Sequence, residues 1–222
     1  MYLLFDTPFA QHFDSRQFTL EAQERISAFL IRHGFDGVKL DGFLTRYANL
    51  LNKEQLSVTG GTTSFARAQL RRVLIPTVCL YRQLQKEEFT EEQALTLTVG
   101  FLRDYVYARA IKLQNQMTHY VVRRRKKKYY LQTLLPQLTK APFLLEIVRH
   151  TRGELTFKIR HCFYKEALER LGAPELLPYF CELNKVYYDA CYYKTRFSLK
   201  NEQLKSDRPC VFSFRQRQTG GL

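Results

Sequence analysis

Four cysteines lie near the C-terminal end of the chain, where their thiols could act as nucleophiles, metal ligands or core residues. Cys162, Cys181, Cys191 and Cys210 all fall within residues 154–217 of the 222-residue sequence, each close to an expected change of secondary structure. A cysteine becomes nucleophilic as its thiolate, which neighbouring cations favour by lowering the thiol pKa. Arg160 and His161 immediately precede Cys162, so Cys162 is the first candidate for chemistry.

The spacing of these cysteines argues against a metal site. Three cysteines can hold zinc and leave a fourth position for an activated water. Cys162, Cys181 and Cys210 are 19 and 29 residues apart, however, and none belongs to a Cys-x-x-Cys pair. We therefore rank nucleophilic or structural thiols above metal ligands and expect no metal or other cofactor. Three buried thiols that only fill a core remain the alternative, because unligated cysteine is among the most buried residue types.

The elements around the cysteines are predicted from hydrophobic periodicity. Apolar and polar residues alternate over 154–161, over 191–200 and over 210–215, as in half-buried strands. Two helices are expected between the first two strands, over 163–171 and 175–190. Strand, helices and then a hairpin predict a small antiparallel sheet covered by helices.

The residues before this region have helical patterns. Apolar spacings of three and four predict helices from residue 19 to 33, from 41 to 51 and from 64 to 84, the last kinked or broken at Pro76. Thr90 and Gln93 form a capping box that starts a helix expected to reach about residue 119. A short helix is predicted over 143–150. The fold class is therefore α+β, with an N-terminal helical bundle followed by a small antiparallel sheet with covering helices.

Three short motifs in the cysteine-bearing region, and their order along the chain, resemble those of the L-2-amino-thiazoline-4-carboxylic acid hydrolase family. The motifs read Arg-His-Cys-Phe-Tyr over 160–164, Pro-Tyr-Phe-Cys-Glu over 178–182 and Cys-Val-Phe-Ser-Phe over 210–214. The resemblance covers about residues 154–216, and the helices from Arg67 onward are similar to the helical first part of that family. On this basis we divide the chain into an N-terminal helical extension, 1–60, and a hydrolase-like domain, 61–222, with a helical part, 61–150, and an α+β part, 151–222.

The resemblance implies hydrolytic opening of a small cyclic, amidine-like ring that carries a carboxylate. The catalytic candidates are Cys162, Cys181, Cys210, Glu166 and Glu182, the two glutamates as acid or base. The candidates for binding the substrate are Arg160, His161, Arg196 and Arg215, because a guanidinium can hold a carboxylate through paired hydrogen bonds.

Two family positions depart from the expected pattern. An Asp three residues after the second cysteine is Asn184 here, and an Asp directly after the last cysteine is Val211. Neither Asn nor Val can take a proton, so these changes point to either inactivity or a changed reaction within a biosynthetic pathway.

Charge defines a rival hypothesis. The net charge is +14, and residues 112–222 carry 22 basic and 9 acidic side chains, against 13 and 12 in residues 1–111. The run Arg123 to Lys128, flanked by tyrosines, could contact nucleic acid or another anionic partner in a non-catalytic binding protein. The chain has no transmembrane pattern or secretion signal, and we expect a soluble, cytoplasmic protein. A small-molecule substrate is the favoured partner, and a homo-oligomer is compatible with the sequence.

Overall fold

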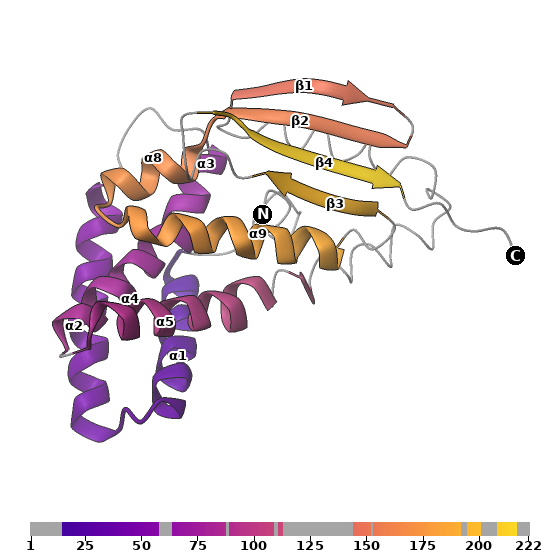
Figure 1. Cartoon of the computed structure of the whole chain (residues 1–222). Coiled ribbons are helices and arrows are strands. Elements are labelled where there is room, and N and C mark those ends of the chain that lie inside the picture. The colour runs from indigo at the N-terminus through magenta and orange to yellow at the C-terminus, as the bar shows by residue number, and fades with distance from the viewer. Residues whose placement is uncertain are drawn as a thin grey trace, which may run out of the picture.

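The computed structural model describes residues 15–57, 64–87, 89–108, 111–112, 144–151, 153–191, 195–200 and 208–216. Within these ranges helices come first and a sheet follows, which confirms the predicted α+β class (Figure 1). None of the described helices is long and apolar enough to cross a membrane.

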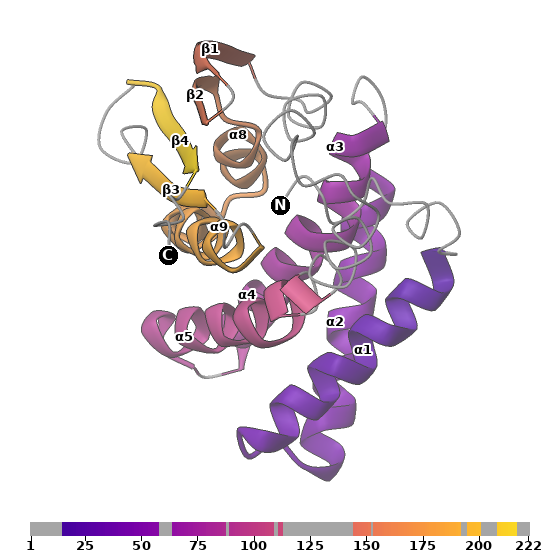
Figure 2. The same ribbon diagram turned by 90° about the vertical axis from the view of Figure 1, so that its right-hand side faces the viewer.

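The N-terminal helices pack around a shared core. α1 (Ser15–Arg32) turns into α2 (Gly37–Ser57), and both glycines of the turn, Gly34 and Gly37, have positive φ angles that other residues rarely adopt. α2 then packs against α4 (Ile75–Lys86), and α4 packs against α5 (Glu91–Phe101). Figure 2 shows α1 and α2 side by side.

Pro76 does not interrupt its helix. The helix runs through α3 (Ser64–Gln69), a π-helical turn over Leu70–Leu74 and then α4. At the end of the wide turn the N–H of Ile75 bonds to the carbonyl of Leu70, five residues back. This wider spacing accommodates a proline, which lacks a backbone N–H, near the start of α4.

A second π-helical turn, over Leu102–Tyr107, follows α5. The predicted capping box is present at the start of α5, where Gln93 N donates to Thr90 Oγ1 over 3.2 Å and Thr90 N donates to Gln93 Oε1 over 3.0 Å. The rest of the helix predicted to reach residue 119, and the basic run over 123–128, lie largely or wholly outside the described residues.

The described strands form one antiparallel sheet in the order β1-β2-β4-β3. β2 (Glu154–His161) begins and ends where alternation predicted, and β4 (Cys210–Gln216) and β3 (Thr195–Lys200) pair antiparallel beside it. α8 (Phe163–Arg170) and α9 (Leu177–Cys191) lie between the sheet and the N-terminal helices, and a short 3₁₀ turn over Pro174–Leu176 precedes α9 (Figure 1).

The helix predicted over 143–150 is wrong. Residues Leu144–His150 form the edge strand β1, which pairs antiparallel with β2. The sequence of β1 lacks the alternation that would have identified it as a strand. Its register against β2 shifts between Leu144 and Leu145 and between Ile147 and Arg149. The sheet therefore begins inside the part of the chain that we had assigned to helices.

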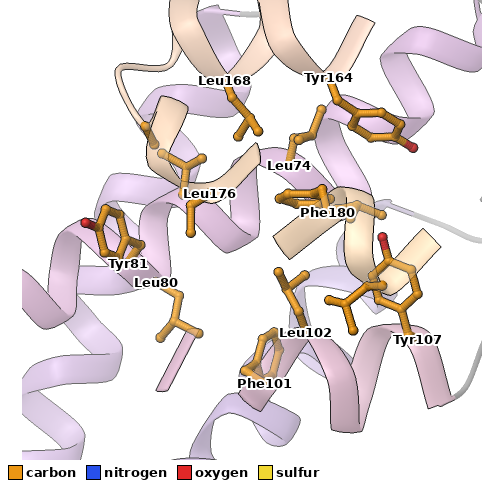
Figure 3. Packing of buried hydrophobic residues seen from close by; sticks show 14 of the residues in the cluster. Leu74, Leu80, Tyr81, Phe101, Leu102, Tyr107, Tyr164, Leu168, Leu176 and Phe180 are labelled. Atoms are coloured by element: carbon orange, nitrogen blue, oxygen red, sulfur yellow. The ribbon is translucent and has the colours of Figure 1, made fainter. Parts of the chain in front are cut away.

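A single core of buried side chains extends from the helices to the sheet. Figure 3 shows its central part, where Phe180 of α9 lies among residues of α4, α8 and the segment after α5. Arg82 of α4 joins three elements, because it donates to the carbonyl of Leu171 after α8 and to Glu54 of α2, the latter over 3.1 Å. These contacts fix α8 and α9 against the helical layer.

Candidate functional site

The three cysteines among the five catalytic candidates converge beneath the sheet. Cys162 precedes α8, Cys181 lies in α9, and Cys210 begins β4. They are close enough for each of Cys162 and Cys210 to raise the pKa of Cys181, and for Cys210 to raise that of Cys162. Cys210 is buried and the other two are half-buried. The sequence alone could not predict that these three thiols lie close together, because their proximity depends on how α8, α9 and β4 pack.

The local setting of Cys162 has opposing effects on its thiol. Burial is the largest and raises the pKa of Cys162 above its usual value. The backbone N–H groups of Lys165 and Tyr164, at the start of α8, lower it, although the thiol makes no capping hydrogen bond of normal geometry. The net effect is a raised pKa, so the resting thiol is protonated at neutral pH and needs a base to become a nucleophile.

Glu166 is placed to be that base. It lies one turn into α8, its carboxylate raises the pKa of Cys162, and its Oε1 contacts Nδ1 of His161. The two predicted groups on either side of Cys162 are thus joined to each other. Glu182, the other acidic candidate, is exposed on α9.

Sequence reasoning missed a set of buried tyrosines beside the thiols. Tyr107, Tyr164 and Tyr188 are buried, and burial raises the pKa values of Tyr107 and Tyr164 far above the usual one, with the neighbouring thiols adding to the effect. Tyr164 directly follows Phe163 in the first family motif, which was the available signal. Tyr107 lies in a π-helical turn, and no sequence motif pointed to it (Figure 3).

Gln69 adds a buried amide to this cluster. Its Oε1 accepts a 3.3 Å hydrogen bond from the Tyr164 hydroxyl, and it is fully buried. Its Nε2 makes no hydrogen bond within the described part of the chain. A buried donor without a partner is costly and can be satisfied by a polar ligand. We call Gln69, the three tyrosines and the three cysteines the thiol-tyrosine cluster.

Metal binding by the described side chains lacks a geometric basis. No group of three or more His, Cys, Asp or Glu side chains in the described ranges is arranged to hold one metal ion.

The arginine candidates lie on the opposite face of the sheet. Phe212 and Phe214 follow Cys210 on the buried face of β4, whereas Val211, Ser213 and Arg215 point to the open face. Arg196 and Arg215 are directly opposite each other on that open face. Arg160, from the same face of β2, donates to Glu146 over 2.6 Å. The structure thus brings the thiols together and two arginines together, with the sheet between the two sets.

The position of Val211 changes the meaning of one departure from the family pattern. Val211 pairs with Lys158 on one side and with Lys200 on the other. An Asp at this position would lie between two lysines on the open face and away from the thiols. Its replacement removes a negative charge from that face without removing a group from the thiol-tyrosine cluster. Asn184 lies in α9, and its side chain is outside the described set.

The sequence matches the family model of L-2-amino-thiazoline-4-carboxylic acid hydrolase over residues 67–214. The chain belongs to this family. The match covers the helices from Arg67 onward and the sheet up to Phe214 of β4, and it begins at Arg67, where the resemblance in the helices was expected to start. Residues 1–66 lie outside it.

Other comparisons add little to the family assignment. No curated protein matched the hydrolase-family chain. Two crystal structures of the Fe(II) unliganded H-NOX protein from K. algicida aligned with it, each at 11% identity. One covers 92% of this chain and 97% of its own with a TM-score of 0.28, and an alanine-to-glycine variant covers 91% and 96% with a TM-score of 0.27. TM-scores this low do not establish a shared fold.

Proposed function

We propose that the protein hydrolyses a small cyclic substrate of the thiazoline carboxylate class, using the thiol of Cys162. Membership of the hydrolase family supports the reaction class. The observation that carries the assignment to Cys162 is its place at the start of α8 beside Glu166, with Cys181 and Cys210 close by.

The proposed reaction has two stages. The Cys162 sulfur bonds to the ring carbon between nitrogen and sulfur as the carbon–nitrogen double bond at that carbon opens onto nitrogen, and the thiol proton passes to Glu166. One ring bond to that carbon then breaks, and Glu166 gives the proton to the leaving heteroatom. Water attacks the same carbon, the bond to Cys162 breaks, and the thiol regains a proton through Glu166. The sum is substrate plus one water, giving the opened product.

Neighbouring groups have supporting roles in this proposal. The first-turn N–H groups of α8 face the nucleophile and stabilise negative charge that develops there. His161 positions Glu166 by contacting its Oε1. The free Nε2 of Gln69 and the tyrosine hydroxyls supply polar contacts for a substrate in an otherwise apolar interior. Arg196 and Arg215, across the sheet, have no part in holding this substrate.

Glu166→Gln tests the role of Glu166 as the base, because the substitution should speed alkylation of Cys162 and slow turnover. Removing the carboxylate lowers the pKa of Cys162, so iodoacetamide should alkylate Cys162 faster at a fixed pH between 7 and 9, which peptide mass spectrometry can follow. Turnover of a thiazoline carboxylate should nevertheless fall, by about a hundredfold, because proton transfer is lost.

Glu169→Gln is the matched control. Glu169 is exposed on the same helix, and its substitution changes charge by the same amount. It should leave turnover and alkylation unchanged. If Glu166→Gln turned over substrate at the normal rate, Glu166 would not be the base.

A further inference from the structure

The open face of the sheet carries an ordered set of polar side chains. A groove of about 640 Å³ runs across it. Its lining comes from the four described strands: Val148, Arg149, Glu154, Thr156, Arg196, Ser198, Lys200, Val211, Ser213 and Arg215. The strand pairing arranges much of this lining in rows, with Arg215 opposite Arg196 and Ser213 opposite Ser198. The volume lies within the range usual for small-molecule sites.

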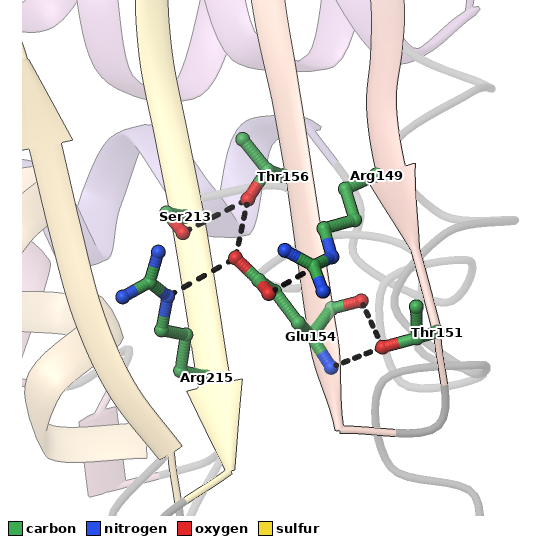
Figure 4. Close-up of polar contacts among 6 residues, drawn as sticks. All are labelled: Arg149, Thr151, Glu154, Thr156, Ser213 and Arg215. Carbon is green, nitrogen blue, oxygen red and sulfur yellow. Dashed lines mark hydrogen bonds and ion pairs between the residues drawn. The ribbon is translucent and has the colours of Figure 1, made fainter.

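Glu154 holds two of the arginines in place. Its Oε1 accepts from Arg215 Nε over 3.0 Å, and its Oε2 lies 3.1 Å from Arg149 Nε. Both guanidiniums are engaged through Nε and remain largely exposed, at 68% and 62%, so their terminal N–H groups are available to a ligand. Figure 4 shows the carboxylate between the two arginines.

Hydroxyl groups form the floor beside this cluster. Thr156 Oγ1 lies 2.9 Å from Ser213 Oγ and 3.4 Å from Glu154 Oε1 (Figure 4). Ser198 is exposed one strand further along, opposite Ser213. Hydroxyls can donate to an anion that the guanidiniums attract.

Arg196 brings a positive charge that the described residues do not compensate. It is exposed and makes no hydrogen bond or ion pair within the described part of the chain. Its direct cross-strand partner is Arg215, and like charges directly opposite each other destabilise a sheet. An anion bound between the two arginines would remove this repulsion.

We propose that this groove binds the phosphate group of a small phosphate monoester. Arg149, Arg196, Arg215 and Lys200 against the single carboxylate of Glu154 leave three positive charges in the lining. This excess favours a ligand with a charge of about −1.5 to −2, which a phosphate monoester carries at neutral pH. Arginine forks suit phosphate oxygens because they form paired, charge-assisted hydrogen bonds. The site lies across the sheet from the thiol-tyrosine cluster and is independent of the proposed hydrolysis.

The test uses inorganic phosphate and glycerol 3-phosphate as probes, with calorimetry at low salt in a phosphate-free buffer. Arg196→Gln and Arg215→Gln should each weaken binding of both probes by about tenfold or more, because each removes charge-assisted hydrogen bonds. Arg196→Gln should also raise the melting temperature of the ligand-free protein, because it removes the opposed pair. Equal affinities for the two probes would show that the phosphate group alone is recognised, and tighter binding of the ester would show added contacts in the groove.

Two controls isolate the site. Arg103→Gln changes charge equally at an exposed arginine that pairs with Asp104 on the helical layer, and it should leave binding unchanged. Cys162→Ala should also bind phosphate normally, so failure of the proposed hydrolysis and failure of this site are distinguishable. No binding by the wild-type protein would overturn the proposal, as would binding by Arg196→Gln and Arg215→Gln that is as tight as binding by the wild type. The proposal would also be overturned if the protein bound single-stranded RNA in an Arg196-dependent way but did not bind glycerol 3-phosphate. The open face would then bind a polyanion.

Discussion

Replacing Cys162 with alanine is expected to lower kcat/KM for ring hydrolysis by about a thousandfold or more while the protein stays folded. When a nucleophile and its base act as a unit, removal of the nucleophile commonly lowers kcat/KM by this factor. Cys162 is only half-buried and makes no capping hydrogen bond of normal geometry to α8, so the fold has little dependence on its sulfur. Steady-state kinetics and thermal unfolding of the same preparations measure the two effects.

Cys79→Ala is the matched control for this substitution. Cys79 is fully buried in α4, where burial raises its pKa to about 12, and it is absent from the set of thiols that influence Cys162. Its replacement should cost stability, by about 1 kcal/mol, and leave turnover unchanged. Turnover by Cys162→Ala at the wild-type rate would remove this thiol from the mechanism.

Replacing Phe214 with alanine is expected to lower the free energy of unfolding by about 3 to 5 kcal/mol. Phe214 is fully buried on β4 and contacts rings from three other elements. Its ring centroid lies 4.8 Å from that of Phe197, 5.2 Å from that of Tyr188 and 6.2 Å from that of Phe157. Such a loss is a large part of the 5 to 15 kcal/mol that stabilises a typical domain. Urea denaturation followed by circular dichroism measures it.

Ser198→Ala on the neighbouring strand provides the comparison. Ser198 is exposed on the open face, and surface changes of this kind usually alter stability by less than about 0.5 kcal/mol. A Phe214→Ala variant as stable as Ser198→Ala would show that the sheet is not held to α9 by this aromatic cluster.

The strands and helices that sequence predicted well have strong local signals. β2 alternates over its whole length, so its bounds could be predicted to the residue. The start of α5 carries the reciprocal bonds of Thr90 and Gln93, which depend on residues only three apart. Such features need no knowledge of the tertiary structure.

β1 and the π-helical turns show where local patterns fail. Ile147 and Val148 are exposed, and the apolar residues of β1 do not alternate with polar ones along the sequence. The pairing of β1 with β2 accommodates this pattern through two register shifts. That segment is a strand because β2 offers a free edge. Likewise Tyr107 reaches the thiol-tyrosine cluster from a π-helical turn, whose wider geometry alters which residues share a face.

The candidate site was predictable in part. Family motifs identified Cys162, Cys181 and Cys210, but their convergence depends on the packing of three separate elements. The separation of Arg215 from Cys210, in contrast, was implicit in the strand itself. Residues five apart on a regular strand point to opposite faces, and the observed burial of β4 follows that rule.

Hydrolysis of L-2-amino-thiazoline-4-carboxylic acid in oxygen-18 water tests the central claim most directly. The purified protein is mixed with the substrate, and the product is analysed by mass spectrometry, with Cys162→Ala in parallel. The proposal predicts a ring-opened product that contains one solvent oxygen and forms only with Cys162 present. An intact substrate after incubation with the folded wild-type protein would contradict it, as would equal product from the alanine variant.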